Sequence, residues 1–350
     1  MHVRRRPPLR ALVLGGTFAF MLAGASSSGL AADMGQAAAR AGTITLYSGQ
    51  HEQTVSQLVG DFTKRTGINV KVRSADEATL ANQIIQEGSK SPADVFFAEN
   101  PPALQVLSEK SILAAVPAAT LAAVPRARSA PSGDWVAISA RAAALDYNTD
   151  KLRKADLPKS LLDLAAPKWK GRFAIAPGET DFQPLITSIA KVRGDAAALT
   201  WLKAVKKNAK VLEDNELIAA AVDKGTVDAG LVDHYYWYRE RDEVGADNTH
   251  SALHYFAPHD PGMLVDVSAA AVLKSSKNAA DAQRFLAYLV SKPAQTIIAT
   301  SESYEYPLRP GVVNHKVIRP LSSIVPARVT ATQLGDGKAA LAMLQQVGLL

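Results

Sequence analysis

The stretch TITLYSGQHEQTVSQLVGDFTKRTGINVKVRS (43–74) decides the fold. Its first part, 43–49, alternates β-branched and polar residues and ends in glycine, which predicts a strand. Apolar residues within 55–62 recur at helical spacing, and Gly67 is a typical C-terminal stop. Residues 68–74 alternate again and predict a second strand. A strand, a helix and a strand in this order indicate parallel strands covered by a helix.

The same alternation continues along the chain. Apolar residues at 80–85 predict a helix that ends at Gly88, ADVFFAEN (93–100) predicts a short buried strand, and two prolines at 101–102 begin another helix. The chain contains neither an internal repeat nor a flexible linker, which favours two interleaved α/β lobes around a ligand cleft over two successive domains. Further strands are expected within 135–148, 170–178, 227–233 and 267–273, and further helices around 200–205, 281–301 and 337–348.

The composition is that of a soluble globular protein. Of the 350 residues, 47% are hydrophobic and 21% are charged, and this balance is inconsistent with extensive disorder. The sequence has no cysteine. Disulfides, thiolate metal ligands and cysteine nucleophiles are therefore excluded, and stability must come from the buried core.

The N-terminus has the pattern of a secretory signal peptide. MHVRRRPPLR is basic, ALVLGGTFAFMLAGA is apolar but too short for a comfortable membrane span, and small residues follow up to Ala32. We expect cleavage after about residue 32 and a periplasmic location, with an uncleaved anchor as the alternative. Residues 1–32 contain four arginines and no acid, so the formal charge falls from +6 to +2 without them. A nucleic-acid partner therefore has little support.

No enzyme motif is present, but metal-binding side chains follow several expected strands. His51 comes after the first strand, Glu99 ends ADVFFAEN, and Tyr235 and Tyr236 follow VDAGLVD. The carboxyl ends of strands in α/β sheets are where ligands bind. Each residue taken alone has an ordinary structural explanation, for example a helix-dipole role for Glu99. Together they make a hard, oxygen-rich set of donors.

Two adjacent phenols are the distinctive part of this set. A phenol has a pKa near 10 and ligates a metal only when a strong cation displaces its proton. Ferric iron is the ion that binds two phenolates most favourably. Softer metals prefer thiolate ligands, which this chain lacks. On a straight strand Tyr235 and Tyr236 would face opposite sides, so we expect the backbone to turn there into a helix. Trp237 and Tyr238 are then expected to pack into the lobe.

The mature chain resembles the periplasmic ferric-ion-binding proteins of ABC-type iron importers, also called bacterial transferrins. The motifs that carry the resemblance are YSGQH (47–51) and HYYWY (234–238), with support from PADVFFAE, PKWKGR, HDPG, SAAAVLKSSKN and EYPLR. The resemblance implies a two-lobed type II periplasmic-binding-protein fold. It also implies that the protein ligands to Fe(III) are His51, Glu99, Tyr235 and Tyr236.

The resemblance also sets expectations for the lobes and partners. We expect one lobe to comprise 42–142 with 264–308, and the other to comprise 143–263 with 309–350. The partners implied are an inner-membrane ABC permease with its ATPase. The protein is expected to act as a monomer and not as an enzyme.

One loop departs from the family pattern. Many members complete the iron site with phosphate or carbonate held by small residues, whereas this chain has APGETDFQP (176–184). Carboxylates here would repel an oxyanion by several kcal/mol at about 4 Å and an effective dielectric near 20. We therefore expect a free anion to be dispensable; the alternative is that the acids face solvent or pair with Arg141. The residues of this anion or sixth-ligand region are Glu179, Thr180, Asp181, Asn215 and Arg141.

Three other functions are compatible with the sequence. An organic cation or a sugar could stack on the aromatics of 235–238, which would leave His51 and Glu99 without a role. A metal-dependent hydrolase could use His51 and Glu99, but no base–nucleophile pair supports it. A structural surface protein would not need these donors.

Overall fold

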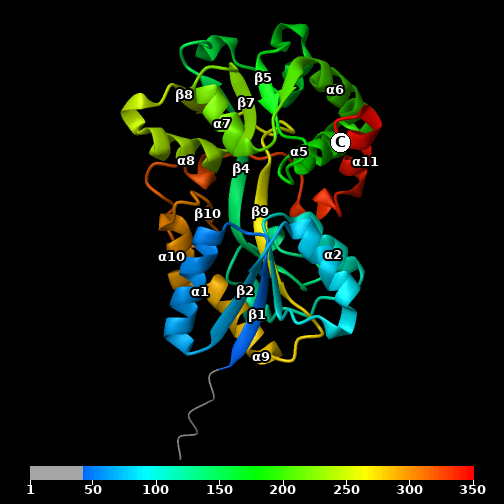
Figure 1. Cartoon of the computed structure of the whole chain (residues 1–350), viewed down its shortest axis with the longest axis vertical. Coiled ribbons are helices and arrows are strands. Elements are labelled where there is room, and N and C mark those ends of the chain that lie inside the picture. The colour runs from blue at the N-terminus through cyan, green and yellow to red at the C-terminus, as the bar shows by residue number, and fades with distance from the viewer. Residues whose placement is uncertain (1–41) are drawn as a thin grey trace, which may run out of the picture. The chain divides into compact units, whose positions relative to one another are not determined.

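The computed structural model describes residues 42–350, so the predicted signal peptide lies outside the described residues. These residues form a mixed ten-stranded sheet with helices packed on its faces (Figure 1). The main strand order is β2-β1-β3-β9-β4-β7-β5-β6, and β8 and β10 also pair with β4. Within 42–350 no helix is both long and apolar enough to cross a membrane.

The opening stretch folds as the sequence predicts. β1 (Thr43–Ser48) and β2 (Asn69–Ser74) pair in parallel, and α1 (Glu52–Thr66) connects them. Helix α1 ends at Gly67, whose φ of 74° lies in the left-handed region that glycine adopts without strain. The next predicted elements are also confirmed, namely α2 (Glu77–Glu87), β3 (Val95–Ala98) and α3 (Pro101–Glu109).

A long central strand joins the two parts of the sheet. β4 (Val136–Asn148) is buried along its whole length. Its residues 136–142 pair with β9 (Val265–Val272), whereas 143–148 pair with β7 (Ala229–Asp233) and β8 (Ser251–His254). The short β10 (Tyr306–Pro307) pairs with β4 on the edge opposite β9.

The parallel pairing predicted from the first strands is confirmed for β2-β1-β3, but the centre of the sheet is antiparallel. β9 runs antiparallel to β3, and β4 runs antiparallel to both β9 and β7. Parallel pairs remain at the two ends, in β2-β1-β3 and β7-β5-β6. The reason is that β9 joins β3 only after the chain has built the other part of the sheet and returned from it.

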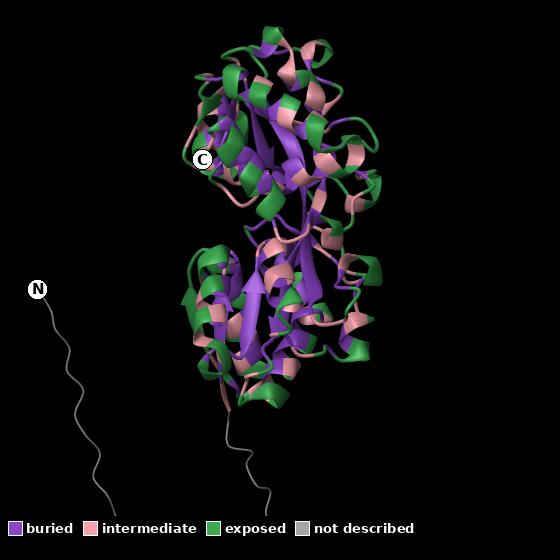
Figure 2. Cartoon of the chain, turned by 90° about the vertical axis from the view of Figure 1, so that its right-hand side faces the viewer, coloured by how far each residue is buried: buried purple, intermediate pink, exposed green. Residues whose placement is uncertain are grey.

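The remaining helices cover the second part of the sheet and the C-terminal region. The helical structure expected at 281–301 is present as two helices, because a proline in the first turn of the second one marks a new start. Figure 2 shows buried strands between helices with exposed outer faces. The bounds are α4 (Ala118–Leu121), β5 (Phe173–Ile175), α5 (Phe182–Arg193), α6 (Asp195–Asn208), β6 (Ala209–Val211), α7 (Asn215–Asp223), α8 (His234–Val244), α9 (Ala279–Leu289), α10 (Lys292–Thr300) and α11 (Lys338–Val347).

Candidate metal centre

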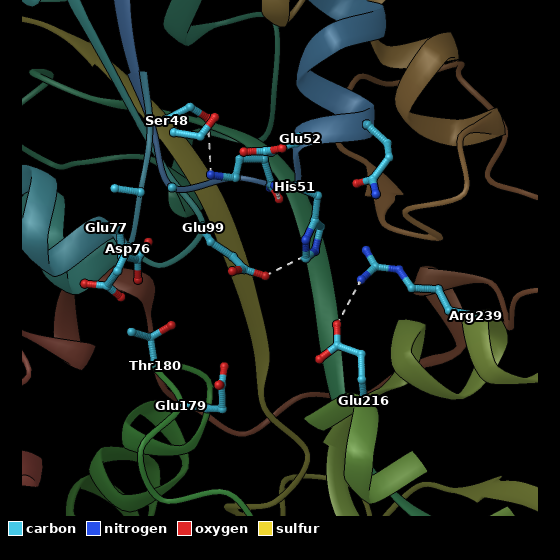
Figure 3. A pocket seen from close by; sticks show the side chains of 15 residues that line it. Ser48, His51, Glu52, Asp76, Glu77, Glu99, Glu179, Thr180, Glu216 and Arg239 are labelled. Carbon is cyan, nitrogen blue, oxygen red and sulfur yellow. Dashed lines mark hydrogen bonds and ion pairs between the residues drawn. The ribbon is translucent and has the colours of Figure 1, made fainter. Parts of the chain in front are cut away.

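The four predicted metal ligands meet at one place. His51 precedes α1, Glu99 follows β3, and the two tyrosines lie in the first turn of α8. The Nε2 atom of His51 is 3.2 Å from Oε1 of Glu99, and the Tyr235 hydroxyl donates a hydrogen bond of 2.8 Å to the same oxygen. In Figure 3 the side chains of His51 and Glu99 lie next to each other, joined by a dashed line.

The tyrosine pair sits at a turn from strand to helix. β7 ends at Asp233 and α8 begins at His234, so the backbone bends where two phenols must point the same way. The ring centroids of Tyr235 and Tyr236 are 4.3 Å apart. Both hydroxyls donate to Oδ2 of Asp181, at 3.2 and 3.1 Å. The turn predicted from the sequence is present.

The two aromatics that follow pack away from this point. Trp237 donates from Nε1 to the hydroxyl of Ser251 at 3.0 Å, and the buried Tyr238 donates to the carbonyl oxygen of Val317 at 3.1 Å. Neither side chain contacts the four ligands through these bonds. They anchor α8 instead.

His51 is poised to ligate a cation. Burial lowers its pKa to about 3, so the imidazole is neutral at physiological pH. Its Nε2 atom is buried and has no aligned hydrogen-bond partner, although it faces Glu99. A buried nitrogen without a hydrogen bond is unfavourable in an empty site and favourable beside a metal ion.

The phenols are held in their neutral form until a strong cation arrives. Burial, together with Asp181 and Glu99, raises the pKa of Tyr235 and of Tyr236 well above 10. Between residues 42 and 350, no cluster of three or more His, Cys, Asp or Glu side chains could hold a metal. Two phenols, a carboxylate and an imidazole fit a hard trivalent ion.

The expected anion region is filled by Asp181. This residue precedes α5 and is almost fully buried, and its Oδ2 atom also accepts a bond of 3.4 Å from Asn215. Thr180 accepts a hydrogen bond from Asn100 at 3.2 Å, and Glu179 lines the pocket with Thr180 (Figure 3). Burial and the Asp181 carboxylate raise the pKa of Glu179 to about 7. Of the two acids in this loop, only Asp181 contacts the phenols.

Arg141 lies behind Asp181 and is completely buried. Its Nε atom is 3.1 Å from Oδ2 of Asp233 and 3.7 Å from Oδ1 of Asp181. Asp266 and Glu305 each have an oxygen 3.9 Å from its guanidinium. Burial alone would lower the pKa of Arg141, but the carboxylates of Asp266, Asp181, Asp233 and Glu99 raise it well above its usual value. The guanidinium is thus a permanent positive charge beneath the site.

Sequence reasoning did not identify Arg239, which lies one helical turn beyond Tyr235. Its guanidinium is 4.6 Å from the Tyr235 ring centroid and 5.7 Å from that of Tyr236, and its Nη1 is 3.9 Å from Glu216. The i, i+4 spacing from Tyr235 was the available signal. Because both phenol rings are buried and Arg239 covers them, they offer little surface on which an organic ligand could stack.

The pocket beside the ligands holds about 460 Å³ and is strongly acidic. His51 and Arg239 line it together with six acids (Figure 3). Such a pocket attracts cations through its electrostatic field. The lining acids are Glu52, Asp76, Glu77, Glu99, Glu179 and Glu216.

Comparison with known sequences gives a consistent result. Residues 57–320 match the family model of the bacterial extracellular solute-binding proteins. The chain is 39% identical over 325 residues to the Fe(3+)-binding periplasmic protein of Serratia marcescens, which covers 93% of this chain and 96% of that one. It is 41% identical over 323 residues to the major ferric iron-binding protein of Neisseria meningitidis serogroup B, with 91% and 97% covered.

Comparison with solved structures agrees with the sequence matches. The iron-bound HitA of Pseudomonas aeruginosa superposes with a TM-score of 0.85 and 39% identity, over 88% of this chain and 99% of that chain. The predicted α/β periplasmic-binding-protein fold is confirmed by this match, and the relatives are binding proteins rather than enzymes. The chain belongs to the bacterial extracellular solute-binding proteins, and within them to the periplasmic ferric-ion-binding proteins.

Proposed function

We propose that this protein captures Fe(III) in the periplasm and delivers it to an ABC permease and its ATPase in the inner membrane. It would act as a monomer, exported by the cleaved signal peptide. The observation that carries the proposal is the convergence of His51, Glu99, Tyr235 and Tyr236. Of these four, His51 and Glu99 line the acidic pocket. We propose these four side chains as the protein ligands, in two lobes bounded as the sequence predicts.

The protonation state of the two phenols supports a trivalent metal ion as the bound substrate. In the absence of metal, both phenols keep their protons and donate to carboxylates. A bound cation must displace both protons from groups whose pKa is raised, which requires a high charge density. Fe(III) with Glu99 and two phenolates is then formally neutral.

Adding ferric citrate to the purified mature protein should produce a visible colour. Phenolate bound to Fe(III) gives a broad charge-transfer band, and we expect it to saturate at one equivalent of iron. The measurement is a visible titration, with Ga(III) as a colourless competitor of the same charge. If no band forms and iron does not co-purify with the protein, the iron proposal is wrong, and a stacked organic ligand regains support.

We further propose that Asp181 takes the place of an external anion. Its Oδ2 atom lies within 3.2 Å of both phenol oxygens, so it borders any position that an ion bridging the phenolates would occupy. The additional negative charge is offset by Arg141, at 3.7 Å from the other carboxylate oxygen. A phosphate at the same place would meet the Asp181 carboxylate and be repelled.

Asp181→Asn should make iron binding dependent on an added anion. We expect the wild-type band to survive gel filtration into buffer without phosphate or carbonate. The variant should bind iron at least about tenfold more weakly there and recover with phosphate, because outer and supporting ligands of metals contribute about 10–100-fold to affinity. Glu179→Gln is the matched control and should behave like wild type. A wild-type protein that itself requires phosphate would contradict the proposal.

A further inference from the structure

The hydrogen-bond ladder along one edge of β4 has a gap. On the edge opposite β9, Ala140 of β4 pairs with Tyr306 of β10, and Ala143 pairs with Asp233 of β7. The N–H of Ala142 falls between these two neighbours and has no strand to bond. This gap lies where β4 passes from one part of the sheet to the other (Figure 1).

The imidazole of His234 fills this gap. Its Nδ1 atom accepts the N–H of Ala142 at 3.2 Å, and its Nε2 atom lies 2.9 Å from the carbonyl oxygen of Tyr304. Because Nδ1 accepts, the proton must be on Nε2, which therefore donates to Tyr304. The ring is fully buried and stacks on Tyr306, with centroids 4.6 Å apart and planes 11° apart. One neutral side chain thus replaces the missing strand contacts.

His234 is also the first residue of the helix that carries both phenols. The residue before it, Asp233, lies at the N-cap of α8 but makes no capping bond, and its carboxylate faces Arg141 instead. The start of α8 is therefore fixed by the two bonds of His234 rather than by a side-chain cap. The ring also contacts Tyr235 edge-on, at a centroid distance of 5.9 Å.

We infer that His234 is a positioning residue for the metal site, which orients Tyr235 and Tyr236 by tying the first turn of α8 to β4 and to the segment before β10. The inference rests on the proposed function but concerns a residue that binds no metal itself. Both of its ring nitrogens are already occupied by backbone groups. Its contribution reaches the iron only through the position of the two phenolates.

The two bonds can be removed separately. In His234→Asn the amide occupies the position of Nδ1 and can still accept from Ala142, but the bond to Tyr304 is lost. In His234→Gln the amide reaches the position of Nε2 and keeps the bond to Tyr304 only. We expect each variant to bind Fe(III) about tenfold more weakly, with a shifted charge-transfer band, because partners that orient a ligand contribute about 10–100-fold to affinity. His234→Ala should lose more than either.

The matched control is His254→Gln. His254 in β8 also bonds a backbone carbonyl through Nε2, that of Pro158 at 2.7 Å, and packs edge-on against Phe256, but it has no contact with the four ligands. Iron affinity, band position and thermal midpoint should be measured for all variants. Lower midpoints with unchanged affinity and band in the Asn and Gln variants would overturn the inference and leave His234 a purely structural residue. A wild-type protein that shows no band and retains no iron would instead refute the proposed function.

Discussion

Tyr235→Phe will abolish tight ferric-iron binding while leaving the fold intact. The substitution removes one hydroxyl group, whose O–H donates to Glu99 at 2.8 Å and to Asp181 at 3.2 Å, and it keeps the ring. The packing of that ring against Tyr236 and beneath Arg239 does not involve the hydroxyl. We expect affinity to fall by more than about a hundredfold, since even partners outside the coordination sphere contribute 10–100-fold.

Tyr238→Phe is the matched control for this experiment. Tyr238 is also a buried tyrosine of α8, but its hydroxyl donates to Val317, away from the site. Competition with a chelator of known affinity, followed by visible absorption, measures iron binding in both variants. The control should keep its band and its affinity. Tight binding retained in Tyr235→Phe would remove Tyr235 from the proposed ligand set.

Local patterns accounted for much of the fold. Alternating apolar residues and the glycine at 67 were sufficient for β1, α1 and β2, because strand and helix periods are properties of neighbouring residues. Strand direction in the middle of the sheet was not predictable in this way. The direction of β9 relative to β3 depends on the long segment of chain that connects them. The residues of the two strands themselves do not indicate this direction.

The kinds of side chain at the site could be predicted from the sequence, but their arrangement in space could be predicted only in part. The adjacent phenols indicated a turn and a hard cation, and the structure has the turn. The sequence does not distinguish the roles of Glu179 and Asp181, because both are acids in the same loop. The conformation of the loop before α5 directs Asp181, and not Glu179, toward Tyr236. The role of His234 depends on a gap between the strands β10 and β7 along β4. The sequence HYYWY gives no indication of this gap.

Arg141→Met will be the most destabilising single substitution near the site. The side chain is completely buried, and Asp181, Asp233, Asp266 and Glu305 lie within 3.9 Å of its guanidinium. Removing the cation leaves these carboxylates buried without a balancing charge in contact. Loss of one partner from a buried ion pair destabilises by about 3–5 kcal/mol, and we expect a loss of at least that range in the free energy of unfolding.

Denaturant unfolding of the metal-free protein measures this loss, and two further variants define its cause. Arg153→Ala breaks an exposed 3.1 Å ion pair with Asp156 and should leave stability unchanged within error. Arg141→Met combined with Asp233→Asn removes one of the stranded carboxylates, whose pKa burial already raises well above its usual value. If the loss is electrostatic, the double variant must be more stable than Arg141→Met alone. If the two substitutions simply add, the arginine stabilises the fold through packing rather than through its charge.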